Sequence, residues 1–577
     1  MFAQIIPLIR MPRRFAHFDY AIPDEIDLRI GDLVNIKFKN RIIQGIVREV
    51  SDKTDYKKIN TIQSIVQKQI MSKDDIKRLE IIAHNIIQSP STVLHCALNG
   101  IKSSNASDIL IKGNKSGSID IGTADIIKQT CEIKQSDAIL ETSYEGAIAA
   151  CRIICAKAKN QILIITPRER DTEIFSSYIP FEHAVLNGKT KTSQRKWILN
   201  AWKSGELKIL IGTKQASLIP ANKIDNIIIF DSHSDDHVSY NMNPRYDARL
   251  CLRLLSKQHN ANILQLNFAQ YLSANKTTTI TDIKPLAKII DLKNQNEKTN
   301  TFLISETLRE AITNSLQNKK SVLLSYNAKG IAKCLQCNVC GHIPLCGTCG
   351  EQPIVRVDDL ICDSCKSEMW IPKVCPACNK NKLSFRGIGN KKLSSDISKL
   401  FPNAKVAIID KEHSRISNAD IIVATEHYFQ SLYEPFESKY GIIAEVCADK
   451  LMGYGYKSVE IMMYKLNRLS HMAHACKSEL IVQTWSPQLI KQMLDNKFSE
   501  TETRIRKQYL LPPFTDEFII FNDNVNINEN IDGINVMKID GNTIIYSNEQ
   551  YRCKIISMLK QLDDSIKILT NYQSYEA

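Results

Sequence analysis

The chain has 577 residues and a formal net charge of +13, with 43% hydrophobic and 24% charged residues. This balance is typical of a globular protein, and the length exceeds one core, so about three to five domains are expected. We find no apolar run that could span a bilayer and no signal peptide at Met1 to Ile9, so we expect a cytoplasmic protein without a membrane partner. The positive charge favours nucleic acid as a partner, although lysine-rich surfaces also occur in proteins that bind none.

Residues 1 to about 70 are predicted to form a small, curved β-domain. Apolar and polar side chains alternate at 33–38 and 42–47, as in half-buried strands. Residues 74–100 are expected to be helical, because apolar side chains recur there at helical spacing. From Lys102 to Gly122 the chain is rich in Ser, Gly, Asn and Lys, which indicates a linker or a surface segment.

From about residue 136 the pattern is α/β. Continuous apolar strands alternate with helices, which predicts parallel sheets covered on both faces. In the first region, strands are expected at 161–167, 208–214, 226–231 and 261–266, with a helix at 245–255. A second region has strands at 321–325, 405–410, 420–425 and 479–484.

A run of cysteines interrupts the second α/β region. Nine of the 17 cysteines lie between Cys334 and Cys378, and eight of these form four Cys-x2-Cys pairs. Such a pair places two thiolates on one side of a tight turn, and two pairs complete a tetrahedral zinc site. The run therefore predicts two closed, structural zinc sites, with Cys334 as an odd thiol. Disulfides or scattered buried thiols are the alternatives, but disulfides are rare in a reducing cytosol.

Several motifs occur in the order in which the PriA (primosomal protein N-prime) family of superfamily 2 helicases has them, and the chain resembles that family along most of its length. The cysteine spacing and the Leu-Pro-Pro-aromatic-Thr box are the most specific of them. The motifs are Phe18-Asp19-Tyr20, Gly212-Thr213-Lys214, Arg245-Tyr246-x-Ala248-Arg249, the cysteine pairs, Gly387-Ile388-Gly389 before Leu400-Phe401-Pro402, and Leu511-Pro512-Pro513-Phe514-Thr515.

The resemblance implies an α/β fold with two RecA-like parallel-sheet lobes. A small β-domain would precede them, a zinc-binding insertion would lie in lobe two, and a short α+β domain would follow. The implied boundaries are 1–100 for a 3′-DNA-end-binding domain, 101–135 for a linker too short for the family's winged helix, 136–295 for lobe one, 296–500 for lobe two with the zinc segment 334–378, and 501–577 for the C-terminal domain.

The resemblance also implies how the cysteines share two zinc ions. Cys337, Cys340, Cys375 and Cys378 would hold the first ion. The second site would be nested inside the first and would use Cys346, Cys349, Cys362 and Cys365.

Phe18-Asp19-Tyr20 resembles the family's pocket for the 3′ end of a nascent strand. There the carboxylate would accept a hydrogen bond from the 3′-hydroxyl, and the aromatic rings would pack on the terminal nucleotide. From the residues alone, an ordinary strand with a buried aromatic ring is an equally good interpretation. Lys39 stands where the family pocket has a glycine, which predicts weaker or less end-dependent binding.

Two further segments are candidate phosphate contacts. Gly212-Thr213-Lys214 stands at a turn that contacts the DNA backbone in such helicases. Arg245 and Arg249 are expected one helical turn apart, where they either grip phosphates together or form a solvated face. His233 and His237 lack further metal ligands at suitable spacing and are interpreted as part of a loop beside the former nucleotide site.

The ATPase motifs of the family are absent. Where the family has a P-loop ending in Gly-Lys-Thr, residues 140–147 carry one glycine, no lysine and two glutamates. Asp231-Ser232 replaces the Asp-Glu of the Walker B box, so that Asp231 could still approach magnesium but the glutamate that orients water is missing. Residues 265–269 and 469–475 replace two further motifs, the second of which has lost its arginines. Loss of an arginine finger alone costs roughly 10³ to 10⁵ in rate, so we expect no ATP hydrolysis.

We therefore interpret the chain as a replication restart (primosome) protein without helicase activity. It would bind forked and single-stranded DNA and recruit single-strand-binding protein and helicase-loading proteins, with two zinc ions as its cofactors. Two alternatives remain open: an active ATP-dependent 3′–5′ DNA helicase with a divergent motor, and a zinc-dependent interaction scaffold that binds DNA weakly.

Overall fold

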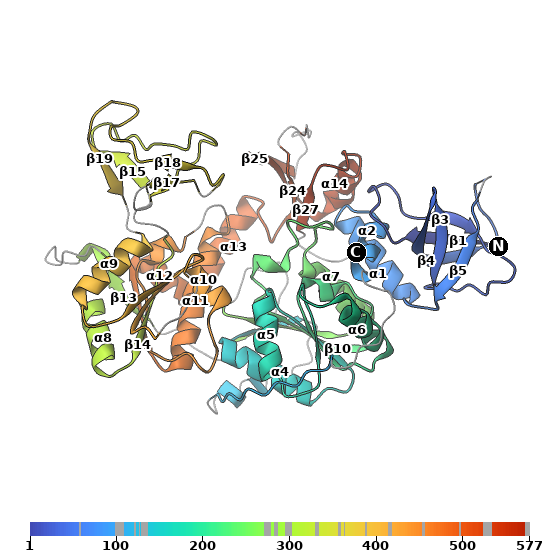
Figure 1. Cartoon of the computed structure of the whole chain (residues 1–577), viewed down its shortest axis with the longest axis horizontal. Helices are drawn as coiled ribbons and strands as arrows, with labels where there is room; N and C mark the ends of the chain where they lie inside the picture. The colour runs from blue at the N-terminus through green and yellow to red at the C-terminus, as the bar shows by residue number, and fades with distance from the viewer. Residues whose placement is uncertain are drawn as a thin grey trace. The chain divides into compact units, whose positions relative to one another are not determined.

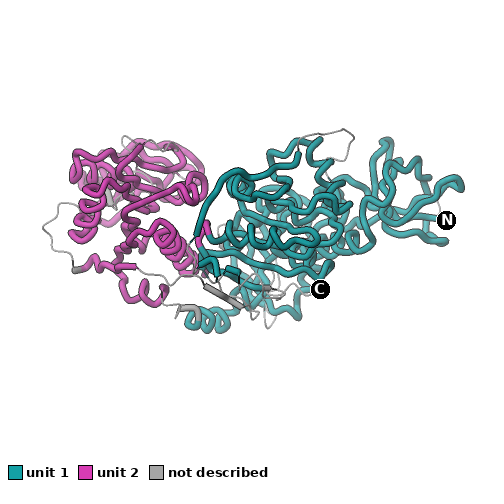
Figure 2. Tube along the Cα trace, turned by 90° about the horizontal axis from the view of Figure 1, so that it is seen from below, with its two compact units in different colours: residues 1–142, 146–282, 499–577 teal, residues 143–145, 283–498 magenta. Residues whose placement is uncertain are grey.

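The computed structural model divides the chain into two compact units (Figures 1 and 2). Unit 1 comprises residues 1–142, 146–282 and 499–577, and unit 2 comprises residues 143–145 and 283–498. The residues that the structure describes are 1–56, 59–98, 109–119, 123–125, 127–128, 137–269, 278–281, 287–294, 303–328, 334–355, 359–362, 364–386, 389–413, 418–452, 456–494, 498–522, 525, 534–539, 541–571. Most of the expected linker 101–135, and Gly387-Ile388 of the expected motif, lie outside them.

Five antiparallel strands form the N-terminal sheet, as the alternation predicts. Its order is β2-β1-β4-β3-β5, and the strands are β1 (Phe2–Pro7), β2 (Phe18–Ala21), β3 (Leu33–Phe38), β4 (Arg41–Ser51) and β5 (Ile62–Gln67). Alternate side chains point to one face and build a buried core from Ala3, Ile5, Val34, Ile36 and Val47. Gly45 allows β4 to lie close to β1, because a Cβ there would lie 2.4 Å from Cγ2 of Ile5.

The stretch predicted to be helical at 74–100 forms two helices, α1 (Lys73–Asn85) and α2 (Pro90–Leu98). Ser72 caps α1, since its hydroxyl accepts from the N–H of Asp75 and the Asp75 carboxylate accepts from the N–H of Ser72. The chain turns at Ile87, whose φ is +56°. Pro90 opens α2, where a missing N–H costs no helical bond.

Lobe one is an all-parallel, seven-stranded sheet of order β12-β6-β11-β10-β7-β9-β8. Its helices α6 and α7 pack on one face of this sheet through Trp202 and Leu252, which join Leu163 and Leu210 in a common core. The elements are β6 (Asp137–Glu141), α4 (Tyr144–Ala156), β7 (Gln161–Ile165), α5 (Glu169–Tyr178), β8 (Ala184–Leu186), α6 (Thr192–Ser204), β9 (Ile209–Gly212), β10 (Ile224–Phe230), α7 (Ala248–His259), β11 (Asn262–Asn267) and β12 (Thr278–Thr281).

Lobe two is a six-stranded parallel sheet of order β13-β23-β22-β14-β21-β20. The side chains of α8 and α9 enter its core through Leu308, Ile312, Leu393 and Ile397. The elements are β13 (Lys288–Asp291), α8 (Glu306–Gln317), β14 (Ser321–Ser325), α9 (Asn390–Leu400), β20 (Val406–Ile409), β21 (Ile421–Ala424), α10 (Glu426–Ser431), β22 (Tyr440–Glu445), α11 (Ser458–Cys476), β23 (Glu479–Thr484) and α12 (Pro487–Leu494). The two predicted parallel-sheet lobes are therefore confirmed.

The cysteine-rich segment is inserted in lobe two between β14 and α9. Antiparallel pairing of β15 (Cys334–Cys337) with β19 (Leu383–Arg386) closes the base of the insertion. The strands β16 (Ile354–Val355), β17 (Asp359–Ile361) and β18 (Glu368–Trp370) form a small sheet within it. Among the residues of the insertion that the structure describes, the apolar core consists of Leu335, Val355 and Leu360 with three partly buried neighbours, which is too little to hold the segment without other bonds.

The C-terminal region is an antiparallel sheet of order β25-β26-β24-β27 packed on α14. The elements are α13 (Phe498–Gln508), β24 (Asp516–Ile520), β25 (Ile534–Ile539), β26 (Asn542–Ser547), α14 (Arg552–Leu559) and β27 (Ile568–Asn571). Among the described residues, no helix has both the length and the apolar character needed to cross a bilayer.

Candidate metal centres and DNA-binding surfaces

The four Cys-x2-Cys turns share one backbone geometry. In each, the residue after the second cysteine donates its N–H to the carbonyl of the first cysteine at 2.9 Å. That residue lies in the left-handed region, with φ of 74° at Gly341, 78° at Gly350, 62° at Lys366 and 54° at Asn379. Glycine and asparagine adopt this conformation at low cost, whereas lysine does so less readily. Each turn therefore presents its two sulfurs to one side.

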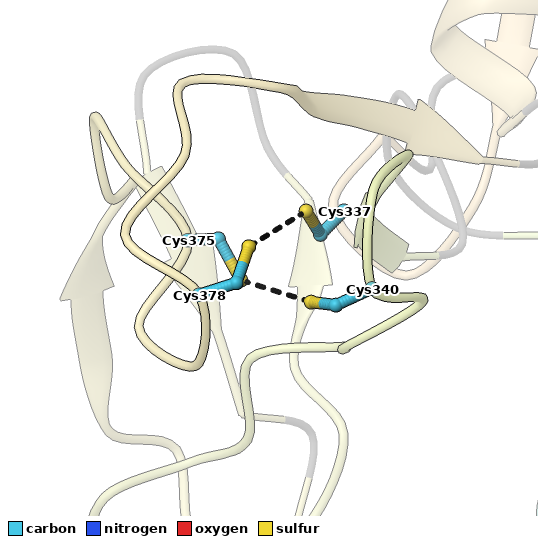
Figure 3. Close-up of side chains that lie close together, drawn as sticks. All are labelled: Cys337, Cys340, Cys375 and Cys378. Atoms are coloured by element: carbon cyan, nitrogen blue, oxygen red, sulfur yellow. Dashed lines mark hydrogen bonds between the residues drawn. The ribbon is translucent and has the colours of Figure 1, made fainter.

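The eight cysteines gather in the two groups that the resemblance implies. In the first group, shown in Figure 3, Sγ of Cys337 lies 3.6 Å from that of Cys378, and Sγ of Cys340 lies 3.6 Å from that of Cys375. In the second, the corresponding distances are 3.5 Å for Cys346 and Cys365 and 3.4 Å for Cys349 and Cys362. All four sulfurs of each group lie within 4.8 Å of one another.

These distances suit a metal and not disulfides. A bonded sulfur pair is about 2.05 Å apart, whereas the edge of a tetrahedron with metal–sulfur bonds of about 2.3 Å is about 3.8 Å. At least one thiol in each group is prepared to ionise, whereas burial and the neighbouring sulfurs raise the pKa of Cys378 and of Cys349 to about 12. N–H groups of Cys340 and Val339 lower the pKa of Cys337 to about 6, and the Ser367 hydroxyl is the main cause that lowers the pKa of Cys346 to about 5. Each group can therefore bind a metal ion.

The insertion also exposes large apolar side chains. Trp370, at the end of β18, is 86% exposed, Val339 is 59% exposed and Leu345 is 56% exposed. Val339 lies between two candidate ligands of the first group, and Leu345 lies directly before the second. The sequence analysis did not single out Trp370, because a tryptophan in a short strand is more often buried than exposed.

Phe18, Asp19 and Tyr20 line a cavity of about 250 Å³ in the N-terminal sheet together with Lys37, Phe38, Lys39, Tyr56, Ile59 and Asn60. The Phe18 ring stacks on Phe15 at 5.8 Å and meets Phe38 edge-on at 5.4 Å. The Tyr20 hydroxyl donates to the carbonyl of Lys37 at 3.1 Å, so Tyr20 holds the wall of the cavity.

Asp19 retains capacity to accept hydrogen bonds. The Thr54 hydroxyl donates to its Oδ2 at 2.7 Å, and an ionised carboxylate offers about four acceptor positions. Lys39 has a φ of 51°, the left-handed conformation that a glycine adopts without strain. Its side chain adds a cation to the lining of the cavity.

The Gly212-Thr213-Lys214 segment follows β9. A Cβ at position 212 would lie 2.6 Å from Cβ of Ala216 and 2.9 Å from the carbonyl of Leu186, so packing alone requires this glycine. The Lys214 ammonium donates to the carbonyl of Asp236 at 2.9 Å. The segment thus has a structural explanation beside the expected phosphate contact.

The prediction that Arg245 and Arg249 lie one helical turn apart is wrong. Asp247 caps α7 by accepting from the N–H of Arg249, so the helix begins at Ala248 and Arg245 precedes it. Arg245 is buried and donates to the carbonyl of Tyr240, while Arg249 pairs with Asp247 at 2.7 Å and donates to the carbonyl of Ser232 at 2.7 Å. Both guanidinium groups hold the loop before α7.

A charged network occupies the carboxyl edge of the lobe-one sheet, which we call the lobe-one edge. Arg168, between β7 and α5, donates Nε to Oδ2 of Asp171 at 2.9 Å and a terminal nitrogen to Oδ2 of Asp231 at 3.1 Å. Its other terminal nitrogen lies 3.5 Å from Oδ2 of Asp236. Asp231 is the carboxylate that the sequence analysis left available to magnesium.

Hydrogen bonds continue along this edge. Asn267 Oδ1 accepts from the N–H of Ser232 at 2.8 Å and from its hydroxyl at 3.0 Å. His237 is fully buried, with Nε2 3.0 Å from the carbonyl oxygen of Phe230, and burial lowers its pKa to about 4. The two histidines considered for a metal thus belong to a loop, and His237 is neutral at pH 7.

Side chains in or next to the segments that replace the P-loop and the arginine motif also form hydrogen bonds within the protein. Glu141 and Glu145 are buried, and Glu145 accepts from the Tyr433 hydroxyl at 2.6 Å within unit 2. In α11, the arginine nearest to residues 469–475 is Arg468, which is bidentate to Glu426. These residues do not fit a magnesium–ATP complex: two buried carboxylates replace the phosphate-binding lysine, and Arg168 is bound to the candidate metal ligand.

The comparisons with known proteins agree with this architecture. Residues 8–99 match the family model described as a 3′DNA-binding domain (3′BD), and residues 146–245 match the model of the helicase conserved C-terminal domain. The second match falls in lobe one.

Relatives share most of the chain. The replication restart protein PriA of Rickettsia conorii is 25% identical over 556 residues, covering 86% of this chain and 84% of the relative. The same protein of Borreliella burgdorferi is 29% identical over 357 residues, covering 57% of this chain and 54% of the relative. Among solved structures, S. cerevisiae Dbp5 bound to RNA and ADP BeF3 has a TM-score of 0.33 over 66% of this chain and 90% of that chain at 8% identity, which is too loose a likeness to support an assignment. On the relatives, the 3′DNA-binding match and the paired lobes with their cysteine insertion, the chain is similar to the PriA family of replication restart proteins over most of its length.

Proposed function

We propose that this protein recognises branched replication forks through the 3′ end of a strand and recruits replication partners without working as a helicase. The observation that carries the proposal is the cavity around Phe18 and Asp19, inside the residues that match the 3′DNA-binding model. An aromatic ring beside a carboxylate with spare acceptor capacity suits a terminal base and its free 3′-hydroxyl.

The residues that replace the P-loop support the second half of the proposal. A phosphate-binding loop needs successive backbone N–H groups and a lysine, and residues 140–147 provide neither a glycine-rich turn nor a lysine. Arg468 is bound to Glu426. DNA binding would then depend on fork shape and strand ends rather than on translocation.

The insertion is the proposed platform for partners. Two structural zinc ions would stabilise a segment whose own core is small, by on the order of 10 kcal/mol per site. The exposed Trp370 provides the kind of rigid aromatic surface that anchors protein partners and single-stranded DNA. Single-strand-binding protein and a helicase loader are the proposed partners.

Fluorescence anisotropy with forked DNA tests the 3′-end proposal. A fork with a free 3′-hydroxyl should bind at least about tenfold more tightly than the same fork ending in a 3′-phosphate, because a hydrogen bond to a charged acceptor is lost. Asp19→Asn should remove most of this preference, and Asp52→Asn, at an exposed position outside the cavity, should retain it. Equal affinity of the wild type for both ends would refute end recognition.

An active 3′–5′ helicase is the second candidate, because residues 146–245 match a helicase model. An assay of ATP turnover by zinc-replete protein, with and without the same fork, distinguishes the two candidates. DNA-stimulated ATP turnover would establish the helicase candidate, and its absence together with fork binding would support the proposed function. If the protein is a scaffold that binds DNA weakly, its affinity for every DNA should be low and should change little with salt concentration. Phosphate contacts instead make DNA affinity fall steeply with salt.

A further inference from the structure

Arg168 lies where a nucleotide-binding lobe would hold its metal. It lies three residues after the end of β7, and Asp231 directly follows the neighbouring parallel strand β10, so both residues are at the carboxyl edge where ligands bind in such sheets. Asp171 and Asp231 are 2% and 4% exposed. Two buried carboxylates at this edge require a compensating cation.

The guanidinium provides that cation from within the chain. It contacts Asp171 at 2.9 Å and Asp231 at 3.1 Å, and its third nitrogen faces the more exposed Asp236 at 3.5 Å. Arginine remains protonated throughout the pH range of a folded protein, and its planar fork matches several carboxylates at once. Unlike a magnesium ion, it cannot dissociate.

A divalent cation would meet two obstacles here. To reach Asp231 it must displace a hydrogen-bonded guanidinium, and the displaced positive charge would remain within a few ångströms. Residues 140–147, which stand in place of the P-loop, contain no lysine that could bind the phosphates of a nucleotide. A fixed cation thus already holds these carboxylates before any ligand arrives.

We propose that Arg168 permanently replaces the divalent cation at the lobe-one edge and excludes a metal–nucleotide complex from it. The inference rests on the proposed function, because it explains why ATP would not be hydrolysed. It goes further in assigning the exclusion to one residue and in predicting that a neutral side chain at position 168 creates a divalent cation site.

Manganese binding by the whole, zinc-loaded protein provides the test, with free Mn²⁺ measured by electron paramagnetic resonance and thermal unfolding followed in parallel. The wild type should bind no Mn²⁺ at this edge, and its Tm should not rise with MgCl₂ or MnCl₂ beyond a sodium chloride control of equal ionic strength. Arg168→Gln should have a lower Tm, should bind one Mn²⁺ per chain, and should recover stability in Mn²⁺ or Mg²⁺.

Three further variants make the result specific. Arg170→Gln removes a neighbouring, half-buried arginine whose guanidinium nitrogen lies 3.8 Å from a carboxylate oxygen of Glu173, and it should behave as the wild type. Asp231→Asn added to Arg168→Gln should abolish the new Mn²⁺ site. Arg168→Lys keeps the charge and should bind no Mn²⁺; Mn²⁺ binding by this variant would overturn the proposal even if Arg168→Gln does not fold.

The outcomes separate this inference from the proposed function. Saturable Mn²⁺ binding by the wild type that Asp231→Asn removes would overturn the role of Arg168 even if no ATP is hydrolysed. An Arg168→Gln protein that folds but is indifferent to divalent cations would do the same. ATP turnover by the wild type would overturn the proposed function as well.

Discussion

The cysteine groups and the lobe-one edge are two places where the family resemblance implies a bound cation. The cysteine groups retain a complete set of metal ligands, whereas the carboxylates of the edge are bound to an arginine of the chain itself. The insertion keeps all eight thiols in turns that aim the sulfurs at two common points. The edge keeps the strand order of a nucleotide-binding lobe, but a guanidinium holds its carboxylates. Retention of a fold is therefore no guide to a bound ion, whereas retention of a complete ligand set is.

The largest expected effect tests the metal side of this comparison. Cys375→Ser removes a buried ligand of the first group, and because a structural zinc contributes on the order of 10 kcal/mol, one of two zinc ions should be lost. Metal analysis and limited proteolysis of the insertion would measure the change. Cys553→Ser, at an exposed position far from both groups in sequence, should keep two ions. Two ions in Cys375→Ser would contradict the assignment.

The next largest expected effect is a loss of stability at the lobe-one edge as the pH decreases. The pKa of His237 is about 4 in the folded protein and about 6.5 when unfolded. Between these pH values the unfolded chain therefore binds more protons than the folded protein. The contribution of His237 to the free energy of unfolding is fully present above pH 6.5 and falls by on the order of 3 kcal/mol as the pH decreases to 4.

Hydrogen exchange of residues 224–259 at pH 7 and pH 5 measures this loss separately from any metal release in unit 2. His237→Gln should flatten the pH dependence, because the glutamine amide has no charge to acquire. His474→Gln, at an exposed position, should leave it unchanged. A steep dependence that persists in His237→Gln would assign the sensitivity to other groups.

A smaller effect tests whether hydrogen bonds hold the edge together. Asn267→Leu has a similar shape but removes the acceptor of the Ser232 N–H and hydroxyl, which should cost about 1–3 kcal/mol. Urea unfolding of unit 1 would show it, with the zinc content unchanged. Ser232→Ala removes only the hydroxyl and should cost less. Equal stability of all three proteins would show that this network contributes little.

The smallest effect refines the geometry of the cysteine turns. Lys366 occupies the left-handed position that glycine fills at two equivalent turns. Lys366→Gly should slow metal transfer to a chelator, with a gain of at most about 1 kcal/mol. Lys373→Gly, where φ is not positive, should give no gain. Faster zinc loss from Lys366→Gly would mean that other contacts of the lysine outweigh its backbone strain.

Features set by local sequence were predictable. The four cysteine pairs follow from spacing, although their division into two groups came from the family resemblance, and the buried strands at 161–165 and 321–325 follow from continuous apolar runs. The helix α7 was placed too early because the pattern does not reveal that Asp247 caps it. Strand β22 and helix α11 carried no prediction, since moderately apolar segments with scattered polar residues give no clear period.

Features set by distant contacts were not predictable. Arg168 meets carboxylates 63 and 68 residues away, which only the parallel register of β7 and β10 brings to it. The sequence analysis had therefore left Asp231 free for magnesium. In the same way, the exposure of Trp370 depends on a small sheet whose strands are too short to recognise in the sequence.

The paired strands β15 and β19 close the insertion at its base, because the chain enters and leaves it through these adjacent antiparallel strands. Loss of metal would then unfold only the part of the insertion between these two strands, while the order of the lobe-two strands stays intact. Under the proposed function, the supply of zinc would then control whether the insertion is folded for partner binding.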